Sequence, residues 1–274
     1  MRYILFFLSA CVVSVACSSA NKTHNWSDLE SVSVTQELSI PITDIDKETL
    51  IADFSGLTVD QAGRILVADT KSQKIHVFSP KGAYIQSIGR SGKGPGEFER
   101  MDADIQVMAD TLYVKQNQMH RIDLFDLNKM EHIRSVTIPR KKIGGISLGT
   151  PRNLYPLRNG NMLISFIVPY FLKPKKDSPA KQFTISTIDP RGNFINDHLL
   201  QQPTLYPTDQ KIVYQASRSM AVYTNLQIYP NTFFVADPKG SGDFFIGNSD
   251  SLKFKKYSKE GTLQSTTPEN FTHS

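Results

Sequence analysis

Residues 63–78 read Gly-Arg-Ile-Leu-Val-Ala-Asp-Thr-Lys-Ser-Gln-Lys-Ile-His-Val-Phe, and this pattern recurs along the chain. Counted from Gly63, apolar residues fall at offsets +2, +4, +12, +14 and +15, and a glycine falls at +19. Most of these offsets recur from Asp110, Gly160 and Gly242, the copy at Gly160 only when 13 extra residues are allowed. An internal repeat of this kind decides the architecture before any single motif is considered.

Each copy predicts a short antiparallel sheet. Apolar and polar residues alternate with period two in 65–67 and 75–78, which is typical of half-buried strands. A glycine turn such as that of 79–82 follows, and a further strand is expected before each copy, at 56–59, 103–107 and 233–235. Four strands per copy, with successive copies 47, 50 and 82 residues apart, indicate the blades of an all-β β-propeller. A β-sandwich would not require the same offsets to recur.

The N-terminal segment predicts export. Residues 3–16 form an apolar run after Met1-Arg2, too short to span a bilayer and suited to a signal peptide at 1–16. Ser14-Val15-Ala16-Cys17 resembles a bacterial lipobox, so Cys17 is the expected lipid-attachment residue, with 17–30 as a flexible tether. The alternative is an ordinary signal peptide with two incidental cysteines, Cys11 and Cys17. A strand within 31–42 is expected to complete the last blade, which would remove an exposed sheet edge.

The composition fits a soluble globular domain on a tether, with 39% hydrophobic and 21% charged residues. Basic residues cluster at 140–142 and 173–176, in loops that are read as solvated, with anionic headgroups or polysaccharide as the alternative contacts. No basic stripe with interleaved aromatic residues is visible, which argues against nucleic-acid binding.

The stretch Asp60–Phe78 looks like an NHL-type repeat, and residues 88–98 resemble an inter-blade loop of the six-bladed β-propeller lipoproteins of Bacteroides-type bacteria. The resemblance covers about residues 30–265. It implies a cell-envelope propeller with no established common activity. Only about four blades are visible, so the propeller domain at 31–266, followed by a polar tail at 267–274, is expected to be an incomplete ring of a truncated family member.

The inter-blade loop contains Gly89, Gly92, Gly94, Pro95 and Gly96. Its glycines mimic a phosphate-binding loop, but no helix N-terminus follows that would face an anion. The interpretation is therefore a tight crossover between blades.

Candidate chemistry is sparse. His76 and His120 are expected on exposed strand faces, and no nucleophile elbow is expected. Four aspartates are channel or metal candidates: Asp53, Asp60, Asp104 and Asp237. Calcium-dependent propeller lactonases gather such oxygen ligands around one cation. Asp60 and Asp237 also lie at turns, where aspartate is favoured by local hydrogen bonds alone.

Two functions remain open. The first is a non-enzymatic, membrane-anchored binding module for a peptide, a glycan or an envelope protein, without a cofactor. It would lie in the bacterial cell envelope, as an outer-membrane lipoprotein or in the periplasm. The alternative is a metal-dependent hydrolase, lactonase or lyase with a divalent cation, Ca²⁺, in the central channel. The first is favoured, because the carboxylates are scattered along the sequence.

Overall fold

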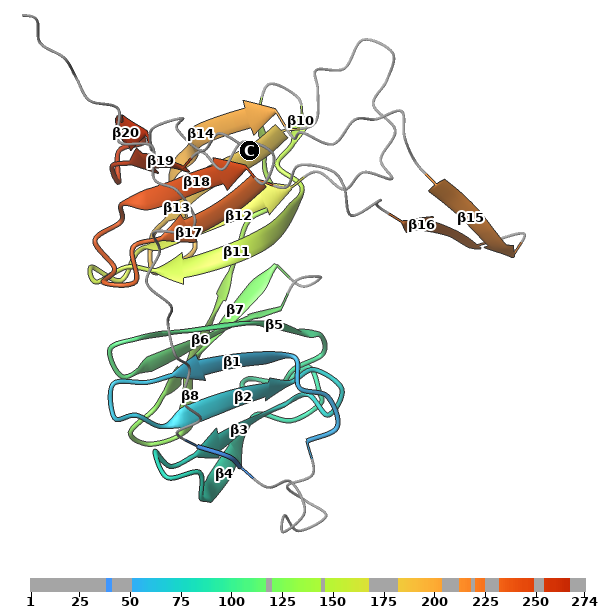
Figure 1. Cartoon of the computed structure of the whole chain (residues 1–274), viewed down its shortest axis with the longest axis vertical. Coiled ribbons are helices and arrows are strands. Elements are labelled where there is room, and N and C mark those ends of the chain that lie inside the picture. The colour runs from blue at the N-terminus through green and yellow to red at the C-terminus, as the bar shows by residue number, and fades with distance from the viewer. Residues whose placement is uncertain are drawn as a thin grey trace, which may run out of the picture. The chain divides into compact units, whose positions relative to one another are not determined.

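The structure is a computed structural model, and its described part consists of strands, turns and loops (Figure 1). It describes residues 38–40, 51–116, 120–143, 146–167, 182–203, 212–217, 220–224, 232–248 and 254–266. All of these lie in one compact unit, Val34–Pro268. The predicted signal peptide, Cys17, the tether, the basic cluster at 173–176 and the C-terminal tail lie outside the described residues. Within the described ranges there is no helix that is long and apolar enough to cross a membrane.

Four sheets of four antiparallel strands follow one another along the chain, each with its strands in sequence order. Blade 1 consists of β1 (Gly56–Val59), β2 (Ile65–Asp69), β3 (Lys74–Phe78) and β4 (Tyr84–Ile88). Blade 2 consists of β5 (Met101–Met108), β6 (Thr111–Gln116), β7 (Arg121–Asp126) and β8 (Glu131–Thr137). Blade 3 consists of β11 (Thr150–Pro156), β12 (Met162–Ile167), β13 (Gln182–Ile188) and β14 (Phe194–Pro203). Blade 4 consists of β17 (Thr232–Ala236), β18 (Phe244–Asn248), β19 (Phe254–Tyr257) and β20 (Leu263–Thr266). The prediction of an all-β propeller with four visible blades is confirmed.

Two smaller, two-stranded sheets lie between the blades in the sequence. Strands β9 (Lys142–Ile143) and β10 (Ile146–Ser147) pair between blades 2 and 3, and β15 (Ile212–Ser217) and β16 (Met220–Thr224) form a hairpin between blades 3 and 4. The hairpin lies within 196–232, a stretch in which the repeat gave no signal.

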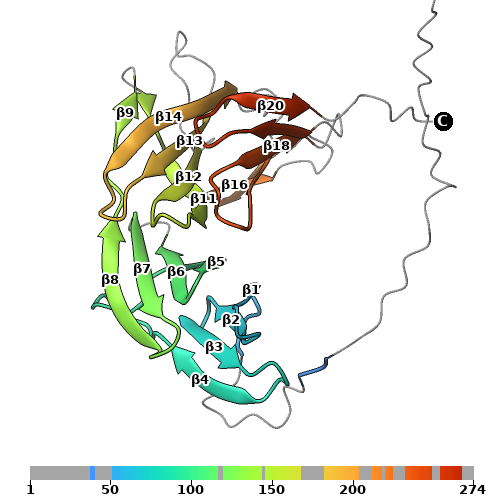
Figure 2. The ribbon, with the colours of Figure 1, turned by 90° about the vertical axis from the view of Figure 1, so that its left-hand side faces the viewer.

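The first strand of each blade lies on its inner side and the fourth on its outer side (Figure 2). Strand β5 contacts both β1 and β11, so the first strands of blades 1 to 3 adjoin one another. Residues at the ends of these strands therefore share one inner surface.

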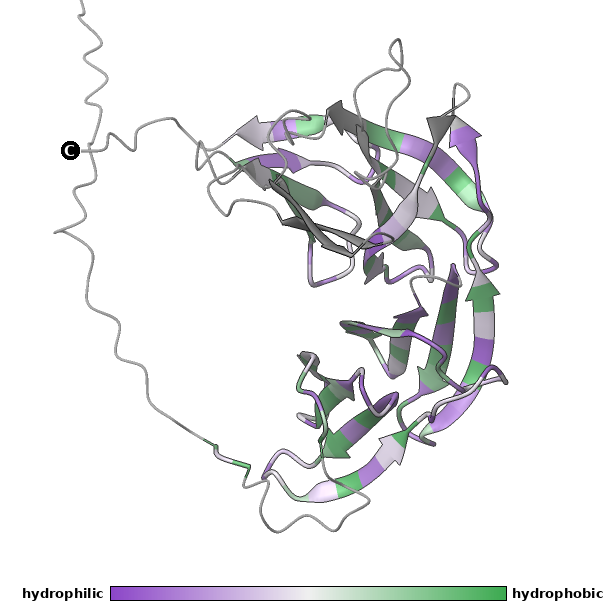
Figure 3. Ribbon diagram, turned by 90° about the vertical axis from the view of Figure 1, so that its right-hand side faces the viewer, coloured by the Kyte–Doolittle hydropathy of each residue, from purple (hydrophilic) through white to green (hydrophobic). Residues whose placement is uncertain are grey.

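Alternation along each strand decides which neighbouring blade a side chain meets. We call the side of a blade that points toward the next blade in sequence its leading face, and the opposite side its trailing face. In β2, Leu66 points to the leading face and Val67 to the trailing face. Hydrophobic and hydrophilic residues change along the strands accordingly (Figure 3).

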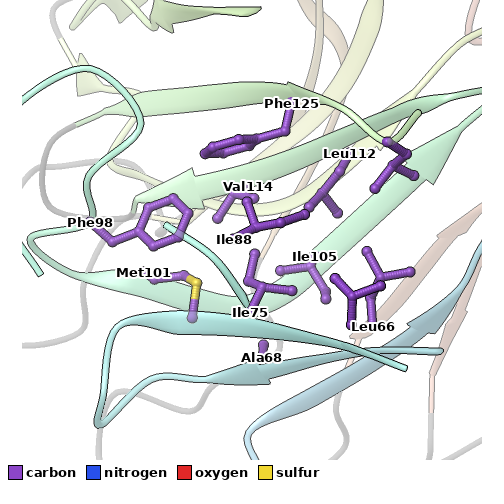
Figure 4. Packing of buried hydrophobic residues seen from close by; sticks show 12 residues of the cluster. Leu66, Ala68, Ile75, Ile88, Phe98, Met101, Ile105, Leu112, Val114 and Phe125 are labelled. Atoms are coloured by element: carbon purple, nitrogen blue, oxygen red, sulfur yellow. The ribbon is translucent and has the colours of Figure 1, made fainter. Parts of the chain in front are cut away.

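Three apolar clusters join consecutive blades. The first packs Leu66, Ile75 and Ile88 of blade 1 against Ile105, Leu112 and Phe125 of blade 2 (Figure 4). Equivalent clusters join blade 2 to blade 3 and blade 3 to blade 4. Burial of each such side chain contributes about 1.5–3 kcal/mol. A single four-stranded sheet has no core of its own, so the blades are stabilised by each other.

The turn between the third and fourth strands depends on glycine, as the sequence predicts. Gly82 has φ 83° in blade 1, and Gly261 has φ 83° in blade 4. A side chain is disfavoured in this left-handed conformation, whereas glycine adopts it without steric cost.

The predicted strand at 31–42 is wrong for its described part, residues 38–40. Leu38–Ile40 is not part of any sheet. The side chains of Leu38 and Ile40 instead lie 3.1–3.3 Å from the position that a Cβ of Gly82 would occupy, so they cover a turn of blade 1. Apolar alternation over so few residues does not distinguish a paired strand from an extended segment that packs on a turn.

Candidate functional site

Asp60, one of the four candidate aspartates, is buried in the turn between β1 and β2. Its Oδ1 accepts the main-chain N–H of Arg64 at 2.8 Å, and its Oδ2 accepts Arg64 Nε at 2.6 Å. The Nη1 of Arg64 donates to the carbonyl oxygen of Leu127 in blade 2 at 2.7 Å. Asp60 therefore orients a link between two blades.

Asp237 lies in the turn between β17 and β18. Its Oδ1 accepts the main-chain N–H of Lys239 at 3.0 Å, and its main-chain oxygen accepts the N–H of Gly240 at 2.8 Å. A hydrogen bond from Ser241 lowers the pKa of the Asp237 carboxyl. All of these contacts are local to the turn.

Asp53 is exposed and precedes β1. Its Oδ2 accepts hydrogen bonds from Ser55 Oγ at 2.6 Å and Thr70 Oγ1 at 2.9 Å. The bond from Ser55 is the main reason that the pKa of Asp53 is lowered. This carboxylate fastens the segment before β1 to the end of β2.

Asp104 differs from the other three candidates because it belongs to a cluster of polar groups at the interface between blades 2 and 3. We call this the inner polar cluster and define it as Asp102, Asp104, Gln106, Lys115 and Arg152. Lys115 of β6 is fully buried, and its Nζ pairs with the Oδ2 of Asp102 in β5. The Oδ1 of Asp104 accepts Gln106 Nε2 at 2.6 Å. The cluster therefore contains two carboxylates and two cations on adjoining strands.

Burial shifts Asp104 and Lys115 toward their neutral forms. It raises the pKa of Asp104 and lowers the pKa of Lys115, in each case as the largest cause. Asp102 and Asp104 partly oppose the shift of Lys115, because their charges favour its protonated form. Asp102 is partly exposed and Arg152 is exposed, so the cluster meets solvent.

Tyr155 of β11 extends the polar contacts to blade 4. Its hydroxyl donates to the carbonyl oxygen of Phe234 at 2.9 Å, and its ring packs edge-on against the Phe234 ring. Burial, followed by the charge of Asp104, raises the pKa of Tyr155 to about 12. Tyr155 is therefore a neutral donor near neutral pH.

The convergence of aspartates that the metal-dependent alternative requires is not found in the described part of the chain. Among the described residues, no three His, Cys, Asp or Glu side chains are placed so that they could hold a metal ion. Asp53, Asp60 and Asp237 serve turns or segment ends, and only Asp104 lies in a cluster, beside a lysine.

The loop with Gly89, Gly92, Gly94, Pro95 and Gly96 closes on its own residue Glu97. The Glu97 carboxylate accepts the main-chain N–H of Gly94 at 2.8 Å and Arg90 Nε at 2.8 Å. Gly89 has φ 76°, and a Cβ there would lie 2.1 Å from the Phe98 ring. The loop binds its own carboxylate and packs tightly as it passes from blade 1 to blade 2.

The expectation that His76 is exposed is wrong, because its side chain is fully buried. Its Nδ1 lies 3.3 Å from Ser87 Oγ, and that hydroxyl lies 2.8 Å from Tyr84 OH. Its Nε2 lies 3.7 Å from Asp69 Oδ2, which is too long for a hydrogen bond. His120, also expected to be exposed, is half-buried in the turn before β7 with φ 48°.

A second buried network surrounds Asp123 in blade 2. Its Oδ2 accepts Gln116 Nε2 at 2.5 Å and Arg121 Nε at 3.0 Å, and its Oδ1 accepts Ser135 Oγ at 2.5 Å. His132 Nε2 lies 3.2 Å from Ser135 Oγ and 3.4 Å from Asp123 Oδ1. A catalytic triad would bind serine and aspartate through different imidazole nitrogens. This network is therefore not arranged as a triad.

Lys115 was missed by sequence reasoning, although the repeat contains a signal for it. It stands at offset +5, where the other copies carry Ala68, Ser165 and Gly247. This offset lies on the leading face, which packs against the next blade. A lysine at a position otherwise held by small residues marks a polar site within an apolar interface.

These blades and their inter-blade clusters define the protein as a β-propeller. Residues 40–163 match the model of a family described as a 6-bladed beta-propeller, so this part of the chain is similar to that family. The resemblance stated from the sequence is thereby confirmed. A comparison with curated proteins gives no match.

Several solved structures are similar to this chain. A protein of Bacteroides fragilis described as exported is 12% identical with a TM-score of 0.44, covering 82% of this chain and 73% of its own. A protein of unknown function from Bacteroides caccae is 18% identical with a TM-score of 0.37, covering 52% and 47%. A gluconolactonase of Xanthomonas campestris is 13% identical with a TM-score of 0.41, covering 77% and 60%. The chain thus spans less than two thirds of the last two proteins, and these likenesses are too weak to assign an activity.

Proposed function

We propose that the protein is a lipid-anchored β-propeller of the bacterial cell envelope. In this proposal it binds a peptide, a glycan or an envelope protein and catalyses no reaction. The observation that carries the proposal is the inner polar cluster.

The cluster replaces apolar packing by paired charges at the inner end of the interface between blades 2 and 3. Burying Lys115 costs free energy unless its charge is compensated, and Asp102 supplies that compensation. The small residues at the equivalent positions of the other blades show that the fold does not require a lysine there. A pre-arranged set of donors and acceptors beside an apolar wall is typical of ligand sites.

The exposed members of the cluster define what it would recognise. Arg152 offers several N–H donors, and the partly exposed Asp102 offers an acceptor. Main-chain amides and sugar hydroxyls each present both donors and acceptors, so both classes of ligand complement this pair. No step of bond making is needed for such recognition.

Binding is tested by screening the full mature chain against a glycan array and a displayed peptide library. Arg152→Gln and Asp102→Asn are expected to weaken the retained ligands by about tenfold each. The matched control is Arg191→Gln, which changes an exposed arginine in the turn between β13 and β14. Equal binding by all three variants and the wild-type chain would exclude the inner polar cluster as the site.

The anchor is tested at Cys17. Intact-mass spectrometry of the mature protein is expected to show an N-terminal Cys17 that carries a diacylglyceryl group, and Cys17→Ser is expected to release the protein from membranes. A mature N-terminus without lipid mass would instead identify an ordinary signal peptide and a periplasmic protein.

The alternative, a metal-dependent hydrolase, is not favoured by the positions of its four proposed ligands. Asp53, Asp60 and Asp237 are each engaged in separate local contacts. Calorimetric titration with Ca²⁺ followed by a lactonase and esterase screen checks this directly. Calcium binding together with turnover would replace the binding-module proposal.

A further inference from the structure

The first strands of blades 2 and 3 carry β-bulges at equivalent positions. In β5, residues 102–104 lie opposite the single residue Lys115 of β6. In β11, Arg152 and Asn153 lie opposite the single residue Ser165 of β12. The first two strands of blades 1 and 4 pair without such an irregularity. A bulge re-aims side chains and is common beside functional sites, so these two bulges indicate a site shared by blades 2 and 3.

The two bulges lie side by side on the inner surface. Strands β5 and β11 contact each other, and the main-chain N–H of Leu154 donates to Asp104 Oδ2 at 3.4 Å. Burial is the largest cause of the lowered pKa of Lys115, and the positive charge of Arg152 lowers it further. The bulge of blade 3 therefore places the Arg152 guanidinium within electrostatic reach of the charged groups of blade 2.

The bulge of blade 3 offers hydrogen-bond donors that are not used within the described ranges. The buried Ser165 Oγ donates to Asn153 Oδ1 at 3.0 Å and accepts the Asn153 main-chain N–H at 3.0 Å. This contact orients the amide of Asn153 and leaves its two Nδ2–H donors without an acceptor among the described residues. The exposed Arg152 likewise forms no ion pair or hydrogen bond with any of them. A guanidinium group and an amide group on successive residues thus remain for a ligand.

The acceptors of the inner polar cluster are already engaged by protein groups. Lys115 pairs with Asp102, and Asp104 accepts Gln106 Nε2 at 2.6 Å. Burial also raises the pKa of Asp104, which favours its neutral form and so reduces the negative charge that would repel an anion. The capacity that remains is mainly that of donors, which suits a ligand with a carboxylate group.

We propose that the two bulges bind the carboxylate group of an acidic sugar. This inference rests on the binding function proposed above and narrows it to one class of ligand. Arg152 binds the carboxylate with two parallel N–H···O bonds, and Asn153 Nδ2 supplies a further donor. The partly exposed Asp102 accepts a neighbouring hydroxyl. A sugar ring holds its carboxylate and hydroxyls in a fixed arrangement, whereas an acidic peptide side chain has rotatable bonds that must be ordered on binding.

The experiment compares glucuronate with glucuronamide, in which an uncharged amide replaces the carboxylate on the same sugar. NMR titration of the full mature chain is expected to show glucuronate binding at least about tenfold tighter than glucuronamide. Arg152→Gln is expected to weaken glucuronate binding by about tenfold and to leave glucuronamide binding unchanged. Arg152→Lys keeps the charge and loses the planar guanidinium, so its affinity for glucuronate is expected to lie between those of the wild type and Arg152→Gln.

The control is Arg191→Gln, which removes an exposed arginine in the turn between β13 and β14 and is expected to bind both sugars like the wild type. Thermal unfolding checks that each variant is folded. Equal binding of glucuronate and glucuronamide, or no binding of glucuronate, overturns the inference. Tighter binding of an N-acetylated glutamate amide overturns it as well, because that result identifies an acidic peptide as the ligand.

In each of these cases the binding function itself is judged separately. It stands if ligands retained from the glycan array or the peptide library lose affinity in Arg152→Gln, whatever their charge.

Discussion

The main chain of Gly56 in β1 lies against that of Ala103 in β5, so closely that a Cβ on Gly56 would lie 2.0 Å from the Ala103 carbonyl oxygen. Glycine is therefore required where the first strands of blades 1 and 2 meet. The close approach also fixes how the inner ends of the two blades sit together.

Gly56→Ala is expected to destabilise the protein by about 1–3 kcal/mol, because the added methyl group meets main-chain atoms that cannot move independently. Urea unfolding measures the change. Gly94→Ala is the control: its Cβ would first meet the flexible side chain of Glu97 at 3.0 Å. Equal loss of stability in both variants would contradict the steric explanation.

Arg64→Met removes the ion pair with Asp60 and the hydrogen bond to the Leu127 carbonyl oxygen. We expect a loss of about 1–3 kcal/mol in the free energy of unfolding, because Asp60 is left buried without its charged partner. The control is Arg90→Met, since Arg90 pairs with Glu97 at the surface and its loss is expected to cost at most about 1 kcal/mol. If the Arg90 variant is the less stable of the two, the link between blades 1 and 2 is not the important contact.

Lys115→Met leaves Asp102 and Asp104 without their buried cation. We expect a loss of about 3 kcal/mol at neutral pH, measured by denaturant unfolding. The double variant Lys115→Met/Asp102→Asn is expected to recover most of this loss, because it removes the pair and not one partner. If the double variant is no more stable than Lys115→Met, then Lys115 stabilises the interface by packing and not by charge.

Stability is expected to fall as the pH drops through the histidine range. Burial lowers the pKa of His76 below its ordinary value of 6.5, although Asp69 partly opposes the shift and Lys74 adds to it. Below pH 6.5 the unfolded chain therefore binds a proton that the native chain does not, and the native state loses stability until the pH reaches its own lower pKa. Burial of the half-exposed His120 and the charge of Arg140 also lower the pKa of His120, so it contributes with the same sign.

His76→Gln is expected to flatten this dependence between about pH 7 and 5, by at most ~1.4 kcal/mol per pH unit for one proton. The measurement is the slope of the unfolding free energy against pH, which does not depend on the variant's absolute stability. An unchanged slope would show that the native and unfolded states protonate His76 alike.

The blades themselves were predictable from the sequence because their causes are local. Alternation of apolar residues specifies a strand, and glycine at the third turn specifies a hairpin, as Gly82 shows with its positive φ. The shared offsets then specify that each sheet buries both faces against equivalent neighbours. These are properties of short segments, so the local amino-acid sequence is enough to predict them.

The candidate site was only partly predictable. Asp104 was singled out, but its partner Lys115 was not, because the pairing of β5 with β6 and the burial of the interface bring the lysine to Asp102 and Asp104. Asp60 and Asp237 have the same residue type as Asp104 yet serve turns. Residue type therefore did not separate a turn aspartate from a clustered one.

The sequence by itself determined four repeated sheets and the face on which each side chain lies. Only the tertiary structure decided which side chains of a face are covered: His76 is fully buried in blade 1, whereas Leu57 on the same face is 54% exposed. The physical reason is that alternation is a property of one strand, while burial depends on a neighbouring segment that packs against it. Which segment becomes that neighbour depends on the tertiary fold and not on the sequence of the strand itself.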